Sequence, residues 1–355
     1  MQTTVSNGAQ NTAQADAGPA CLANRQVDVV FTMAQDGFGP AGADTITLSG
    51  YRLRCQIVST GLESGMACAL RMEGLAQPLL NRLSLMQAGM VAQTRNTVTI
   101  LAGNGAGQGV NTRSVVFSGG VVEAFVDYAN SPDVAFELRA LSGALPAAMP
   151  VAPTSFGGDV AVATVMQVLA AKAGLEFANY GVQTLLRGGV YYKGSVAEQV
   201  DACARAARIS YQIGVGVLAI WPAGMVAQAD GLAHDVSVAT GLVGYPSYSQ
   251  YGVSFLSVFN PAIRFRDTVR VQTGTPAQGA SGGSAATART TAPQATASQG
   301  GGAQSPTQTV AALPASGVWV VQNVRHDLQT EQPDGPWFTT VEAARPDFAG
   351  QAFAR

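Results

Sequence analysis

His326 and Asp327 are adjacent side chains of the kinds that activate a nucleophilic hydroxyl in hydrolases. Such enzymes often present the hydroxyl on a GxSxG turn, and no such turn accompanies this pair. Neighbouring residues of a strand point to opposite faces, so the two side chains cannot act together. We therefore predict no catalytic residue here and a half-buried histidine. Its expected face-mates are Val318, Val320, Val324 and Leu328.

A glycine-rich stretch, AGNGAGQG at 102–109, follows a predicted strand and could cradle a phosphate. A phosphate loop needs a helix next, so that the helix N-terminal amides face the anion. The following residues, VNTRSVVFSGG, indicate another strand, and no GK[ST] is present. We interpret the stretch as the tip of a β-hairpin.

Metal and cofactor sites are not indicated. The four cysteines form no CxxC pair, and the two histidines, His234 and His326, are too few for a zinc centre. We expect reduced, mostly buried thiols and no cofactor. The thiols are Cys21, Cys55, Cys68 and Cys203.

Carboxylates and tryptophans offer two further possibilities. Asp36 and Asp44 flank a glycine-rich turn whose spacing fits no calcium loop. A glycosidase with paired carboxylates stays open on sequence alone, although nothing points to one. Each tryptophan begins or ends a predicted strand, which favours core anchors over a sugar-stacking platform. They are Trp221, Trp319 and Trp337.

The composition favours an assembly subunit. Charged residues make up 12% of the 355 residues, whereas about 25% is usual. Lys and Arg number 20 against 22 Asp and Glu, a net charge of -2, so the chain lacks the basic excess of nucleic-acid binders. A monomer normally carries more charge for solubility, so part of this surface is expected to be covered by other protein.

Alternating apolar residues predict strands from Val27 to about Ala140, interrupted by a helix at 76–86. A Pro-rich boundary at 146–155 follows. A helix is then expected at 158–174, with Asp159 as its N-cap and Gly174 as its stop. A second helix at 194–209 carries a Ser195–Glu198 capping box, and two strands complete a small α+β unit.

The last part returns to strands, at 263–273, 318–328 and 337–345. Before them lies the uncharged aromatic stretch GYPSYSQYGVSFLSVFNP at 244–261. We expect Gly244 and Pro246 to turn the chain, a strand from Tyr251 to Phe259, and Asn260-Pro261 to end it. In that strand Leu256 and Val258 would face neighbouring protein. Residues 274–317 hold one charge and no aromatic residue, and we predict a flexible insertion.

The domain boundaries follow from these changes in sequence pattern along the chain. We expect a flexible N-terminal arm at 1–24, a first β-barrel domain with a short helix at 25–145, and the α+β module at 151–235. A second β-barrel domain spans 236–348 and carries the insertion. Residues 1–20 lack the basic and apolar regions of a signal peptide. The longest apolar candidate, 213–227, is short and broken by Pro222, so no membrane insertion is expected.

The order of several segments resembles the baseplate hub proteins of contractile-tailed bacteriophages, the group similar to the hubs of phages Mu and T4. The segments are LRMEGLAQPLLNRLSLM (70–86), VTILAG (98–103), VVFSGGVVEAFVDYANSPDVAFELRA (115–140), the α+β unit, GLVGYPSYSQYGVSFLSVFNPAIRFRDTVRVQT (241–273), and GVWVVQNVRHDLQTEQPDGPWFTT (317–340). The resemblance spans about residues 25–345, and the long insertion departs from it. The family-motif residues, expected to be structural or interfacial, are Gly244, Tyr245, Pro246, Gly252, Phe259, Asn260, Pro261, Trp319, His326 and Trp337.

The resemblance implies a mainly β fold of two tube-type β-barrels with a small α+β module between them. It implies a non-enzymatic homotrimer in the virion tail baseplate, made in the host cytoplasm, that joins a sixfold tail tube to a threefold central spike. Implied partners are the tube or tube-initiator protein, the spike, other baseplate proteins, the tape-measure protein, and DNA that passes without specific binding. The alternatives are a peptidoglycan-cleaving tail component and a ring component of a contractile injection or secretion system.

Overall fold

Strand formation in the N-terminal part follows from strict alternation of side chains. In β3 (Arg52–Thr60), Leu53, Cys55 and Ile57 are buried while Arg54 is exposed. An alternating pattern of this kind buries one face of a sheet and leaves the other to solvent. The computed structural model describes residues 25–33, 44–60, 65–84, 96–104, 113–129, 131, 133–224, 233–248, 252–273 and 317–346.

The first β region (residues 25–141) contains seven strands and one helix in the described residues. Its elements are β1 (Arg25–Thr32), β2 (Thr45–Ser49), β3, β4 (Met66–Glu73), α1 (Gln77–Ser84), β5 (Thr97–Asn104), β6 (Ser114–Asp127) and β7 (Ala135–Leu141). All neighbouring strands pair antiparallel, in the order β3-β4-β7-β6-β5-β1-β2. The predicted strands and the helix near residue 76 are confirmed.

The helical segment (residues 144–222) contains three helices and packs the two longer ones against small sheets. Its elements are α2 (Ala144–Ala148), β8 (Thr154–Phe156), β9 (Val160–Ala161), α3 (Val162–Ala173), β10 (Glu176–Asn179), β11 (Leu185–Leu186), β12 (Val190–Tyr192), α4 (Val196–Ala207), β13 (Ile209–Gly214) and β14 (Val217–Pro222). The largest of these sheets has the order β10-β14-β13. Its core holds apolar residues of both α3 and α4, among them Met166, Leu169 and Val200.

The ends of the two helices differ in how well the sequence predicts them. The Ser195–Glu198 capping box is present at α4, with both reciprocal hydrogen bonds, and Gly174 ends α3 in the left-handed conformation. The expected N-cap Asp159 is wrong, because α3 starts at Val162 after Ala161. Asp159 instead accepts a hydrogen bond from the Gly188 amide at 3.0 Å, which ties two loops together.

The second β region (residues 234–344) completes the sheet. It contains β15 (His234–Val236), a 3-10 turn η1 (Val238–Thr240), β16 (Leu242–Tyr248), β17 (Gly252–Val258), β18 (Thr268–Val271), β19 (Gly317–Thr330) and β20 (Trp337–Ala344). The expected hairpin of the last two strands is confirmed by their antiparallel ladder. The expected arm at 1–24 and residues 274–316 of the expected insertion lie outside the described residues.

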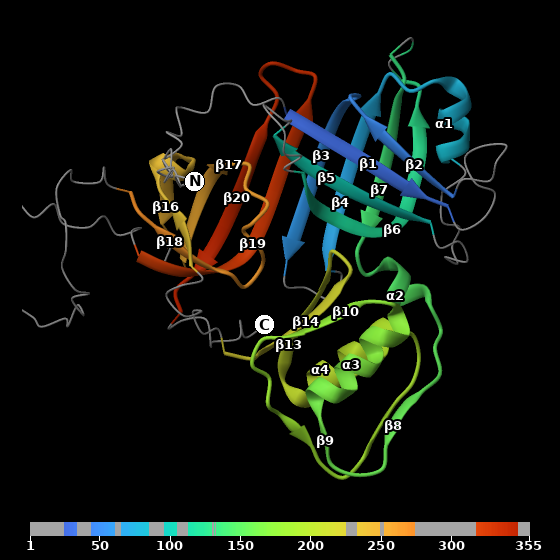
Figure 1. Ribbon diagram of the computed structural model, residues 1–355, viewed down its shortest axis with the longest axis vertical. Coiled ribbons are helices and arrows are strands. Elements are labelled where there is room, and N and C mark those ends of the chain that lie inside the picture. Colours follow the sequence, from blue (N-terminus) through green and yellow to red (C-terminus); the bar gives the residue numbers. More distant parts are fainter. Residues whose placement is uncertain are drawn as a thin grey trace, which may run out of the picture.

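The two β regions share one sheet, because β19 pairs antiparallel with β3 from Asn323↔Thr60 to Thr330↔Leu53. The resulting path, β16-β17-β20-β19-β3-β4-β7-β6-β5-β1-β2, runs through both regions. Figure 1 shows the regions side by side, with the helical segment below them. No helix among the described residues has both the length and the apolar character needed to span a membrane.

Two apolar cores lie in the β regions. The first is centred on Phe31, Phe117 and Phe136 of the first β region, yet it also contains Leu328 and Trp337 of the second. The other belongs to the second β region alone and includes Phe255 and Trp319. The first core therefore crosses the β3–β19 seam and makes the two regions one packed unit.

Candidate functional site

The predicted motif residues fall into four places. Gly244, Tyr245 and Pro246 lie in β16, at one end of the sheet path. The expected turn here is wrong, because β16 continues through these residues with a bulge between Val243 and Ser247. Gly244 takes φ +69, which absorbs the bulge, and Pro246 has no amide to offer. Both features protect an edge strand against unwanted pairing, while Tyr245 stands 84% exposed.

Gly252 lies where two backbones approach closely. It pairs with Ala344 across β17 and β20, and a Cβ here would overlap the carbonyl oxygen of Ala343. The strand that follows alternates as expected, with Phe255 buried and Val258 47% exposed. Tyr251, the expected start of that strand, lies outside the described residues.

Phe259, His326 and Trp337 form one aromatic cluster at the β3–β19 seam. The Phe259 ring meets His326 edge-on at 5.4 Å and Trp337 at 5.1 Å between centroids. The Asn260 amide donates to Thr339 Oγ1 at 3.0 Å, and Asn260 Oδ1 accepts from the Ala262 amide at 3.0 Å. These contacts end β17 and turn the chain at Asn260-Pro261, which also places Pro261 on the wall of the cavity described below.

His326 is a buried, neutral histidine. Its Nδ1 lies 2.9 Å from Thr339 Oγ1, and burial lowers its pKa from 6.5 to about 4. Asp327 points to the other face, where it accepts hydrogen bonds from Gln56 and Arg325. The prediction that the two side chains occupy opposite faces is confirmed, so His326 and Asp327 do not form a pair that could activate a hydroxyl.

The remaining tryptophans pack in aromatic groups. Trp319 is buried beside Tyr248, and the Arg345 guanidinium lies 5.6 Å from its ring centroid. Trp221 stacks on Tyr180 at 5.1 Å with nearly parallel rings. Both arrangements leave one aromatic face occupied by protein, as expected of structural anchors.

The thiols and the other candidate residues do not form a metal or catalytic cluster in the described part of the chain. Cys55, Cys68 and Cys203 are free and buried, and no group of three metal-binding side chains is found among the described residues. The glycine-rich stretch at 102–109 lies between the paired strands β5 and β6, so a strand follows it as expected. Cys21, Asp36 and residues 105–112 lie outside the described residues.

The most extensive group of buried polar contacts among the described residues is not a catalytic cluster. It lies at the junction where the helical segment meets the first and second β regions. Strand β13 contacts the first β region through Ser142, whose hydroxyl donates to the Ile213 carbonyl at 2.5 Å and accepts from the Met66 amide at 2.8 Å. Gln212 Nε2 donates to Ser59 Oγ at 2.9 Å and to the Thr60 carbonyl at 3.1 Å. These bonds fix the helical segment against strands β3 and β4.

The same strand also contacts the second β region. Arg266 Nη2 donates to Ser210 Oγ at 2.8 Å, and Phe265 meets Trp221 edge-on at 5.7 Å. Arg266 is 6% exposed, takes φ +71, and has no ion pair in the described part of the chain. Burial therefore lowers its pKa to about 10. A strained, buried cation at a domain junction is unusual and marks a position under structural constraint.

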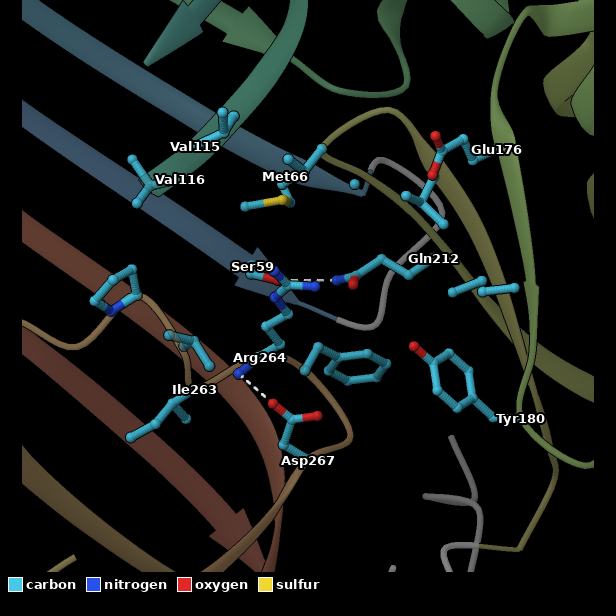
Figure 2. A pocket seen from close by; sticks show the side chains of 18 of the residues that line it. Ser59, Met66, Val115, Val116, Glu176, Tyr180, Gln212, Ile263, Arg264 and Asp267 are labelled. Atoms are coloured by element: carbon cyan, nitrogen blue, oxygen red, sulfur yellow. Dashed lines mark hydrogen bonds between the residues drawn. The ribbon is translucent and has the colours of Figure 1, made fainter. Parts of the chain in front are cut away.

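A cavity of about 390 Å³ lies between these three segments. Figure 2 shows Glu176, Tyr180 and Gln212 on one wall and Ile263, Arg264 and Asp267 opposite them. Asp267 accepts a hydrogen bond from the Arg264 amide at 2.7 Å and lies 3.4 Å from His234 Nε2. Burial raises the Asp267 pKa, which the Arg264 amide and His234 oppose.

Sequence reasoning missed this junction. Ser142, Gln212 and Arg266 stand in stretches without any motif, and their partners lie 71, 153 and 56 positions away along the chain. The only local signal is the alternation of β13, which indicates one buried and one accessible face without naming what covers it.

The fold is similar to that of two tail proteins of known structure. It is similar to the prophage MuSo2 43 kDa tail protein from Shewanella oneidensis, with a TM-score of 0.51 and 10% identity over 91% of this chain and 99% of that chain. It is also similar to the tail protein from Neisseria meningitidis MC58, with a TM-score of 0.53 and 7% identity over 91% and 98%. No curated protein matches the sequence.

Residues 26–274 match the family described as baseplate hub gp41. The chain belongs to this family and is a structural component of a tail baseplate. The resemblance to baseplate hub proteins is thereby confirmed, and the matched residues include the GYP…FNP stretch but not the segment at 317–340.

Proposed function

We propose that the chain is the trimeric hub of a contractile phage tail. It joins the sixfold tail tube to the threefold central spike, and its inner wall continues the DNA channel. Its partners are two further copies of itself, the tube or tube-initiator protein, the spike, other baseplate proteins and the tape-measure protein. The chain acts by assembly and not by catalysis, and it is made in the host cytoplasm.

The observation that carries this proposal is the shared sheet. Two β regions, separated in sequence by the helical segment, join through the β3–β19 ladder. We propose that each region forms a tube-type barrel, so that three subunits present six similar units to the tube. A threefold ring of such subunits matches a sixfold partner without a second kind of protein.

The end of the sheet supports contacts between subunits. Val243 and Val258 are 36% and 47% exposed on the outward side of β16 and β17, and Val238 in η1 is 70% exposed. Exposed apolar residues gathered at one end of a sheet are typical of protein contact surfaces. Because the bulge and Pro246 discourage strand addition at β16, we expect packing of side chains rather than a shared ladder.

Counting subunits in purified virion tails tests the proposal. Quantitative mass spectrometry with isotope-labelled peptides should give three copies of this chain per tail, against a multiple of six for the tube protein. Six copies, or a number that varies with tail length, would place the chain in the tube instead. Complete absence from the tail would remove the hub assignment.

A further inference from the structure

One outward face of the shared sheet carries charges in balanced pairs. On strands β6, β7, β4, β3 and β19 the charged side chains all point away from the two cores, as the alternating burial shows. Five are arginines and five are carboxylates. We name this the paired-charge face, and its members are Arg52, Arg54, Arg71, Arg139, Arg325, Glu73, Glu123, Asp127, Glu137 and Asp327.

Most of these charges meet a partner on the face itself. Arg71 lies 3.1 Å from Asp127 and 2.5 Å from Glu137, both across strands. The carboxylates raise the Arg71 pKa, and the Ala129 amide together with Arg71 lowers that of Asp127. The cationic and anionic forms therefore support each other at neutral pH.

The same arrangement continues toward both ends of the face. Arg52 pairs with Glu73 at 3.3 Å and Arg139 pairs with Glu123 at 3.6 Å. On β19 Arg325 lies 2.9 Å from Asp327. Several of these side chains remain accessible, with Arg139 73% exposed, so the face is open to solvent and nearly neutral over its length.

We propose that the paired-charge face lines the channel through which double-stranded DNA leaves; this rests on the proposed hub function. DNA carries about one negative charge per 1.7 Å, and proteins hold it by replacing its counterions with unpaired Lys and Arg. An arginine that is already paired with a carboxylate attracts a DNA phosphate only weakly, because its charge is largely neutralised. A hydrated, charge-balanced wall therefore lets a polyanion pass without retention or strong repulsion.

The position of the paired-charge face in the sheet makes it a better candidate for the channel wall than the other surfaces. It continues across the β3–β19 seam, so both β regions contribute to it, as a wall formed by six similar units requires. The opposite side of the same strands is occupied by the first core. Beyond β19 the outward face carries the apolar Phe338, Leu256 and Val258 beside Thr340 and the exposed Glu342. The apolar part suits contact with the next subunit at the edge of the channel.

Replacing two carboxylates tests the proposal in whole virions. The variant E123Q/D327N leaves Arg139 and Arg325 without their ion-pair partners on adjoining parts of the face. Three subunits then present six additional arginines without a carboxylate partner. Proteins with six to ten phosphate contacts lose about 10³- to 10⁵-fold in affinity between 50 and 200 mM salt. We expect triggered DNA release to slow about tenfold or more at 50 mM salt and to recover by 200 mM.

Two controls separate charge on this face from other effects. The variant D201N/D235N adds the same charge outside the face, where Asp201 pairs with Arg205 and Asp235 with Arg270, and should release DNA at the normal rate. Removing both arginines as well, in E123Q/R139Q/R325Q/D327N, restores neutrality and should restore the rate. A packing defect would not recover in this way.

The outcomes distinguish the inference from the function beneath it. Unchanged release from virions that contain E123Q/D327N overturns the assignment of the channel wall while the hub function stands. Equal slowing by D201N/D235N overturns it too. If E123Q/D327N does not enter virions, E73Q/D127N/E137Q, which removes every carboxylate that pairs with Arg52 or Arg71, serves in its place. Normal virions without this chain would instead refute the proposed function.

Discussion

Gly65 gives the sharpest test of how the helical segment is held. It precedes β4 at φ +69, and a Cβ here would overlap the Ile213 carbonyl oxygen and Ser142 Oγ. Ala in the left-handed region costs about 1–2 kcal/mol, overpacking costs about 1–3 kcal/mol, and a lost buried hydrogen bond costs about 1 kcal/mol. We expect Gly65→Ala to lower the free energy of unfolding by about 3–5 kcal/mol.

Gly50 provides the matched control. It has φ +73 but open space around the position of a Cβ, so Gly50→Ala carries only the backbone cost of about 1–2 kcal/mol. Urea denaturation measures both variants, and hydrogen exchange of the β13 amides should accelerate in Gly65→Ala alone. If the two variants lose the same stability, or if β13 stays protected in both, the described contact between β13 and the first β region does not hold the segment.

Three further predictions concern the junction, the buried histidine and the apolar end of the sheet. Ser142→Ala leaves the Met66 amide and the Ile213 carbonyl without their partner and should cost about 2–4 kcal/mol in urea denaturation. His326 has a folded pKa of about 4 against 6.5, so the unfolded chain binds more protons between these values. Stability should therefore fall by up to about 3 kcal/mol as pH drops from 6.5 to 4, and His326→Gln should remove that part of the pH dependence. Val258→Asp should change the free energy of unfolding by less than about 1 kcal/mol yet prevent incorporation into tails, as measured by mass spectrometry of purified tails.

Each of these has its own contradicting result. Ser142→Ala would refute the junction if it were as mild as the exposed Ser155→Ala. His326 is not the source of the acid destabilisation if His326→Gln loses as much stability as the wild type between pH 6.5 and 4. Val258 does not lie in a specific contact between subunits if Val258→Asp assembles normally. The same holds if Leu185→Asp, also at an exposed apolar position, impairs assembly equally.

Local features of this fold were predictable because their causes are local. The capping box of α4 needs only Ser195 and Glu198 at the right spacing, and Gly174 ends α3 for lack of a Cβ. Strict alternation likewise predicts strands such as β3 and the opposite facing of His326 and Asp327. In each case the residues that decide the structure are within a few positions of one another.

The β16 bulge shows how local reasoning fails. Gly244 and Pro246 are turn residues by type, yet the ladder with β17 keeps them in a strand and converts the irregularity into a bulge. Tertiary pairing here outweighs local preference. The sequence alone cannot show that a partner strand lies alongside.

The seam and the junction could not be predicted for a related reason. The β3–β19 ladder joins residues such as Gln56 and Asp327 that are 271 positions apart, and nothing in either strand specifies the other. Polar contacts such as Gln212 with Ser59 carry no motif. The balanced face depends on register across five strands, which emerges only once their order is known.

Under the proposed function, three copies of this chain form a ring in which both β regions surround the channel. A cryo-EM reconstruction of the intact tail tip measures this directly. We expect three copies of this chain at the tube–spike boundary, with the paired-charge face toward the lumen and Val258 against the next subunit. A map with six copies, or with the chain outside the channel axis, would contradict it.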